Sequence, residues 1–182
     1  MKKLHWIAIC VLFFGAMRLN AQTKNKKAME ILFAVVERNL ISAAEAMPAD
    51  KYSFAPTNGE FKGVRKFGEQ VKHAAATNYI LAAAALNEDP PADAGDEQGP
   101  DTIYRKEDVV NYLKGSFKQL HKALDAADQE DATVRSSPIS PLQNGTATRL
   151  ALVMESLVHA YDHYGQMVEY LRTNGIVPPA SR

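Results

Sequence analysis

The chain has 182 residues, and its 21 Lys and Arg residues balance 21 Asp and Glu residues to a formal charge of zero. Hydrophobic residues make up 46% and charged residues 23%, which is the composition of a globular protein and argues against a disordered one. The length suits one domain with a sizeable core. Balanced charge without a basic block offers no footprint for nucleic acid, and a single cysteine excludes a disulfide framework.

The N-terminus has the layout of a secretory signal peptide. Lys2 and Lys3 precede an apolar run over residues 4–16, and Ala21 places a small residue just before a cut at Gln22. The run is short for a membrane span, which needs ~20 apolar residues, although a retained N-terminal anchor is the alternative interpretation. We therefore expect an exported protein, periplasmic or secreted, with no membrane association after cleavage.

Removal of the signal peptide, residues 1–21, would change the chemistry open to the chain. Lys2, Lys3 and Arg18 would leave with it, as would Cys10. The mature protein would have 161 residues, of which 18 are basic and 21 acidic, a net charge of −3 and no cysteine. Cysteine-nucleophile catalysis and disulfide bonds are then both excluded.

Hydrophobic periodicity predicts four helices in the remaining chain. Segments that contain proline and glycine separate these helices, and one of them, residues 87–101, is also strongly acidic. Four long amphipathic helices in one small domain indicate an all-α four-helix bundle. The predicted helices span residues 24–47, 64–86, 106–127 and 146–173. The predicted order is a signal peptide over residues 1–21, one bundle domain over 22–176 and a tail over 177–182.

Four histidines remain after cleavage: His73, His121, His159 and His163. The last two are four residues apart, so on a helix their imidazoles stand on one face and can reach a single metal ion. Neutral imidazole suits zinc, nickel, copper or iron. The pair lacks the glutamate of the HExxH protease motif. An isolated pair of histidines at this spacing is also common on helices that bind no metal. For His121, which stands between lysines, we expect solvent exposure.

The helix phase places the histidine pair on a mixed face of the fourth helix. At about 100° per residue, six mostly apolar residues share one stripe. His159 and His163 fall on a further face with Leu152, Ser156, Gln166, Met167 and Tyr170. This face suits a pocket wall or a second packing surface. The stripe consists of Leu150, Met154, Leu157, Tyr161, Val168 and Leu171.

Two stretches of the chain resemble the DinB/YfiT-like superfamily. Residues 47–56, MPADKYSFAP, followed by residues 64–73, VRKFGEQVKH, are similar to the connector and second helix of that family. Residues 159–172, HAYDHYGQMVEYLR, resemble its fourth helix. The resemblance covers essentially the whole mature chain.

The resemblance implies an up-down-down-up four-helix bundle with a divalent metal bound by three histidines. On this match the ligands are His73, His159 and His163, whereas His121 corresponds to no ligand of the family. Zinc or nickel is the metal we expect. Relatives implied by the resemblance include thiol-dependent transferases or isomerases, hydrolases and many proteins of unknown function.

An exported location favours water over a thiol as the activated group, because low-molecular-weight thiols are mainly cytoplasmic and exported compartments are oxidising. The first hypothesis is therefore a metal-dependent, hydrolase-like enzyme acting on an unknown small-molecule substrate. Glu155, Asp162 and Tyr170 are candidates for proton transfer or for bonds to the ligands, although solvated charge and packing explain them as well. The alternatives are a thiol-dependent transferase or isomerase, a non-catalytic metal-binding bundle related to stress that works as a dimer, and a structural bundle that has lost its metal.

Overall fold

The computed structural model describes residues 27–182, so the predicted signal peptide lies outside the described residues. Contacts within the chain separate residues 1–35 from residues 36–182. A helix over residues 27–46 crosses this division. The other helices all belong to the second part: α2 (Phe67–Leu86), α3 (Lys106–Gln129) and α4 (Arg149–Thr173), with the short 3-10 helices η1 (Ala49–Lys51), η2 (Ala92–Ala94) and η3 (Pro179–Ser181).

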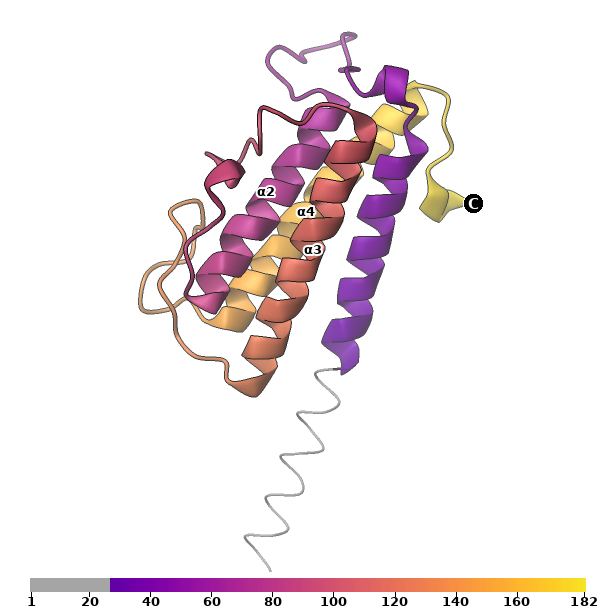
Figure 1. Ribbon diagram of the computed structural model, residues 1–182. Helices are drawn as coiled ribbons and strands as arrows, with labels where there is room; N and C mark the ends of the chain where they lie inside the picture. The colour runs from indigo at the N-terminus through magenta and orange to yellow at the C-terminus, as the bar shows by residue number, and fades with distance from the viewer. Residues whose placement is uncertain (1–26) are drawn as a thin grey trace, which may run out of the picture. The chain divides into compact units, whose positions relative to one another are not determined.

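Within residues 36–182, the rest of the first helix, α2, α3 and α4 run in the order up, down, down, up (Figure 1). The described residues form one isolated bridge, between Thr133 and Thr148, and no strand. The predicted all-α four-helix bundle is confirmed. No described helix combines the length and the apolar character that a membrane crossing requires.

Local hydrogen bonds decide where two of the helices begin. The prediction started the second helix at Val64, but α2 starts at Phe67, where the Glu69 carboxylate accepts a hydrogen bond from the Lys66 backbone N–H at 2.8 Å. Likewise, α4 starts after Thr148, whose hydroxyl accepts from the Ala151 N–H at 3.2 Å. Both bonds satisfy N–H groups that a helix leaves free at its first turn.

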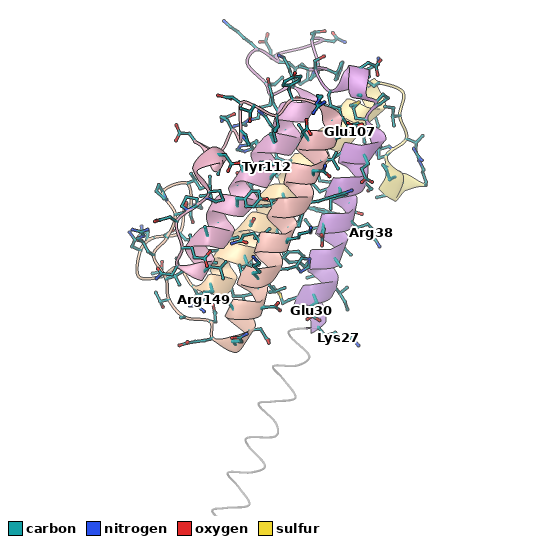
Figure 2. The ribbon with its side chains drawn as sticks, in the orientation of Figure 1. Lys27, Glu30, Arg38, Glu107, Tyr112 and Arg149 are labelled. Carbon is teal, nitrogen blue, oxygen red and sulfur yellow. The ribbon has the colours of Figure 1, made fainter. Side chains whose placement is uncertain are left out.

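Small residues allow α2 to occupy the centre of the core. Ala74, Ala75 and Ala76 are fully buried, as are Ala82 and Ala85. Large side chains of α3 complete the core, among them Leu113, Phe117 and Leu120. Figure 2 shows the side chains along these helices, including Tyr112 of α3, whose ring lies 5.0 Å from that of Tyr79 on α2.

The buried face of α4 matches the predicted apolar stripe only in part. Of that stripe, Leu157 and Leu171 are buried, whereas Tyr161 is 46% exposed and Met154 and Val168 are half-buried. Ser156 and His163 of the mixed face are also buried, among mostly apolar residues. Polar partners on the neighbouring helices explain this burial, because a buried polar group is tolerated where it can form hydrogen bonds.

A buried polar cluster joins α2, α3 and α4 at the centre of the core. Asn78 is fully buried; its amide nitrogen donates to the Ser116 hydroxyl at 3.1 Å, and its amide oxygen accepts from the Ser156 hydroxyl at 2.8 Å. Ser116 in turn donates to the Leu113 carbonyl. The cluster holds three helices at one register, one to two turns from His73 and His159.

Replacement of Asn78 by alanine should lower the free energy of unfolding by about 2–3 kcal/mol, because it removes two buried hydrogen bonds and leaves two serine hydroxyls without them. Urea unfolding followed by circular dichroism measures the change. Asn111→Ala, at an exposed position of α3, is the control and should change stability by less than ~0.5 kcal/mol. A loss in Asn78→Ala as small as in the control would contradict the role of the cluster.

Candidate metal centre

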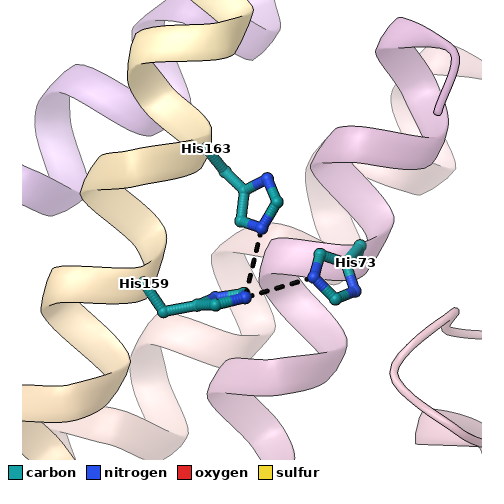
Figure 3. Close-up of side chains that lie close together, drawn as sticks. All are labelled: His73, His159 and His163. Carbon is teal, nitrogen blue, oxygen red and sulfur yellow. Dashed lines mark hydrogen bonds between the residues drawn. The ribbon is translucent and has the colours of Figure 1, made fainter. Parts of the chain in front are cut away.

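Three histidines from two helices meet in the core. His73 comes from α2, and His159 and His163 come from successive turns of α4 (Figure 3). The Nε2 atom of His159 lies 3.1 Å from Nε2 of His73 and 3.1 Å from Nε2 of His163. Each residue can offer one ligand atom within 4.8 Å of the others. The structure thus brings together the three histidines predicted as ligands.

The outer nitrogens of two of these rings are held by hydrogen bonds. Nδ1 of His73 lies 2.7 Å from the backbone carbonyl oxygen of Glu97, and Nδ1 of His163 lies 2.7 Å from the side-chain oxygen of Gln70. Since both partners accept, each Nδ1 carries the proton, and each Nε2 presents a lone pair toward the third histidine. This is the tautomer that an Nε2 metal ligand needs.

The third ring, that of His159, has a buried Nδ1 with no hydrogen-bond partner among the described residues. Its Nε2 can donate a proton to His73 or to His163, but not to both. Without a cation, at least one pair of lone pairs would therefore face each other at short range. A divalent ion satisfies all three nitrogens, and nitrogens bound to tetrahedral zinc at 2.0–2.1 Å lie roughly 3.3 Å apart, close to the distances observed.

A chain of side-chain amides fixes the orientation of His163. Gln70 accepts from His163 and donates through Nε2 to the Gln166 oxygen at 2.9 Å; Gln166 then donates to the Asp162 carboxylate at 2.9 Å. Because a carboxylate only accepts, it sets the direction of both amides and thus places the proton on His163 Nδ1. We refer to Gln70, Gln166 and Asp162 as the amide relay.

Two of these contacts were not predicted from the sequence. Gln70 precedes His73 by three residues and so shares its face of α2, a spacing that could have indicated it. The Glu97 carbonyl offered no such signal, because it lies in the acidic loop 87–101 and reaches the site only by tertiary folding. Glu97 also adopts a left-handed conformation with φ of 67°, which is unfavourable for a residue with a side chain.

The other candidate residues lie away from the three rings or have structural partners. His121 is half-exposed, and its Nε2 lies 2.9 Å from the Glu37 carboxylate, in line with the expected exposure. Glu155 accepts from the Ser140 hydroxyl at 2.6 Å, and the Tyr170 hydroxyl donates to the Arg65 backbone carbonyl at 2.9 Å. Of the three residues considered for proton transfer, Asp162 alone connects to a histidine of the site, through the amide relay.

Burial keeps all three histidines neutral. It lowers the pKa of His163 to about 3, with the charges of His159, His73 and Arg65 acting in the same direction. It lowers the pKa of His159 to about 4, assisted chiefly by His73. The pKa of His73 is also lowered by burial, partly offset by its bond to Glu97. At neutral pH the lone pairs are therefore available without loss of a proton.

These shifts predict the pH dependence of stability for the metal-free protein. Unfolded histidine titrates near 6.5, above the folded pKa values, so the stabilisation is complete above that pH and is lost as pH falls toward the folded values. Between pH 7.5 and 5.0 the free energy of unfolding should fall by about 2 kcal/mol for each of His159 and His163, measured by urea titration at each pH. His121→Gln should show the same fall and His163→Gln a smaller one; an unchanged pH dependence in His163→Gln would contradict the assignment.

The comparisons with known proteins identify the family of the chain. No curated protein matches the chain. The sequence profile described as the DinB superfamily matches residues 32–167, a span that includes His73, His159 and His163 and covers well over half of the chain. The resemblance expected from the sequence is confirmed: the chain belongs to the DinB superfamily.

Proposed function

We propose that the protein is an exported member of the DinB superfamily that binds a divalent metal ion, zinc or nickel, through His73, His159 and His163. We further propose that it uses this ion in hydrolase-like chemistry on a small-molecule substrate. The observation that carries the proposal is the convergence of three neutral Nε2 atoms, two of which have their opposite nitrogen held by an acceptor.

Three histidine ligands favour a catalytic site over a closed structural one, since they leave coordination positions open. A divalent ion at this position would supply Lewis-acid chemistry, by polarising a substrate oxygen or by activating water. The chain's own residues would hold the ion and orient its histidine ligands. His73 is positioned by the Glu97 carbonyl, and His163 by the amide relay, whose carboxylate at Asp162 makes His163 a stronger electron donor.

The location and the assembly are part of the proposal. Export rests on the signal-peptide pattern of residues 1–21, and a homodimer is supported by the outer face of α4. On that face Val158 is 67% exposed and Tyr161 is 46% exposed, which leaves apolar surface available for a second copy. Neither feature bears on the three-histidine site.

A substrate panel tests the catalytic part of the proposal. The mature protein, loaded with zinc or nickel, is assayed against esters, amides, lactones and epoxides, with and without added small thiols. We expect hydrolysis that requires the metal and not the thiol, and that is lost in His159→Ala while His121→Ala retains it. Turnover that requires an added thiol would overturn the choice of water and favour the transferase or isomerase alternative. Metal binding without turnover on any substrate would favour a metal-binding bundle without catalysis.

A further inference from the structure

A polar pocket of about 620 Å³ lies beside the three histidines. Its lining includes Arg65, Glu69, Gln70, Gln98 and Gln166. None of the three histidines contributes to this lining, so the pocket is a feature separate from the histidine cluster.

The pocket touches the immediate partners of two histidines. Gln70 accepts from His163 and Gln166 continues the amide relay, while Gln98 follows Glu97, whose carbonyl holds His73. The positive charge of Arg65 also lowers the pKa of all three histidines. The hydrogen bonds of Gln70 and Glu97 place the pocket next to the candidate metal centre.

Arg65 is the one charged group of this lining that has no ionic partner in the described part of the chain. Its Nε atom is buried and has no hydrogen-bond partner. Glu69, by contrast, is already occupied: its carboxylate accepts from the Lys66 backbone at 2.8 Å and lies 3.7 Å from the Lys66 ammonium. A buried guanidinium nitrogen without an acceptor is costly, and an anionic ligand would supply one.

The backbone of Arg65 is held in place. Its carbonyl accepts the Tyr170 hydroxyl at 2.9 Å, and the Tyr170 ring packs edge-on against Phe54 at 5.8 Å. Arg65 is therefore tied to α4, the helix that also carries His159 and His163. The planar guanidinium suits recognition of a carboxylate by paired hydrogen bonds, because its N–H groups form a fixed fork.

From these observations we infer that Arg65 binds a carboxylate group of the substrate in this pocket, so that the substrate of the proposed metal site is a small carboxylic acid. The guanidinium pairs with a planar carboxylate through two parallel N–H···O bonds. A doubly charged phosphate is less suited, because the lining holds the single positive charge of Arg65 and the negative charge of Glu69. The inference rests on the proposed metal site, whose ion would bind the reacting end of the same molecule.

The test uses the mature protein loaded with cobalt, and small thiols whose sulfur binds the ion and produces an absorption band. Mercaptoacetate, 3-mercaptopropionate and 4-mercaptobutyrate are each compared with the corresponding amide, which lacks the charge. At the best chain length the acid should bind at least ~10-fold more tightly than its amide, as expected for hydrogen bonds to a charged group.

Substitutions of Arg65 test whether this residue causes the preference for the acid over the amide. Arg65→Gln should reduce the ratio between acid and amide to within ~2-fold and leave the affinity of the amide unchanged, which shows an intact fold and metal site; Arg65→Lys should retain part of the ratio. Arg105→Gln is the matched control, since Arg105 is exposed and pairs with Asp108 at 2.9 Å; it should retain the full ratio.

Three results would overturn the inference. They are equal binding of acid and amide at every length, a preference that survives in Arg65→Gln, and tighter binding of 2-mercaptoethyl phosphate than of any acid. Each of these occurs with normal cobalt uptake and leaves the proposed metal site standing. A protein that takes up no cobalt overturns the proposed function itself, and the inference with it, so the two failures are distinguishable.

Discussion

Zinc content should fall from about one ion per chain to less than roughly a tenth when any one of the three clustered histidines is replaced by alanine, because two remaining ligands cannot hold the ion through dialysis. The variants are His73→Ala, His159→Ala and His163→Ala. The zinc content of each, after loading and dialysis against buffer, is measured by mass spectrometry of the metal.

His121→Ala is the matched control for this experiment. His121 is half-exposed and pairs with the Glu37 carboxylate, away from the three clustered rings, so its loss should leave the zinc content unchanged. Circular dichroism of the variants shows whether each remains folded. Full metal occupancy in folded His73→Ala and His159→Ala would refute the assigned site.

Replacement of Gln70 by alanine should weaken zinc binding by ~10–100-fold, the usual effect of removing a group that orients a metal ligand. Without the Gln70 oxygen, the Nδ1 proton of His163 loses its acceptor, and the ring can take the other tautomer, whose Nε2 carries the proton. Stoichiometry at saturating zinc should stay at one. Competition with a colorimetric chelator measures the dissociation constant.

The control for the relay is Gln119→Ala on α3, whose amide makes only a long hydrogen bond of 3.4 Å to Glu88. It should leave the zinc affinity unchanged. Asp162→Ala should weaken binding less than Gln70→Ala does, because Asp162 is exposed and acts through two amides. A change of less than ~3-fold in Gln70→Ala would show that packing alone holds His163.

Most of the fold could be predicted from local patterns. Apolar spacing and proline positions placed the helices to within a few residues, because a helix is stabilised first by contacts between neighbours in sequence. The starts at Phe67 and Arg149 were shifted by hydrogen bonds of Glu69 and Thr148. Such bonds mark the residue at which the helix begins, and the pattern of apolar residues does not predict them.

Hydrophobic periodicity predicted only part of the inward face of α4. Leu157 and Leu171 of the predicted stripe are buried and Tyr161 is exposed, whereas the polar Ser156 and His163 are buried as well. Asn78 and Gln70, two buried residues of α2, form hydrogen bonds with these two side chains. The burial of these two polar side chains thus depended on partners more than 70 residues away in the sequence.

The sequence by itself determined the helical class and the family, and the family resemblance pointed to His73, His159 and His163, of which the four-residue spacing puts the last two on one helix face. It could not determine that the Glu97 carbonyl and the amide of Gln70 would hold the outer nitrogens of His73 and His163. Nor could it determine that the Nε atom of Arg65 would be buried with no hydrogen-bond partner among the described residues. Those relations depend on how α2, α4 and the loop 87–101 pack together. The physical reason is that helix periodicity is a local property, whereas the direction of a hydrogen bond at the site depends on the packed positions of segments distant in the sequence.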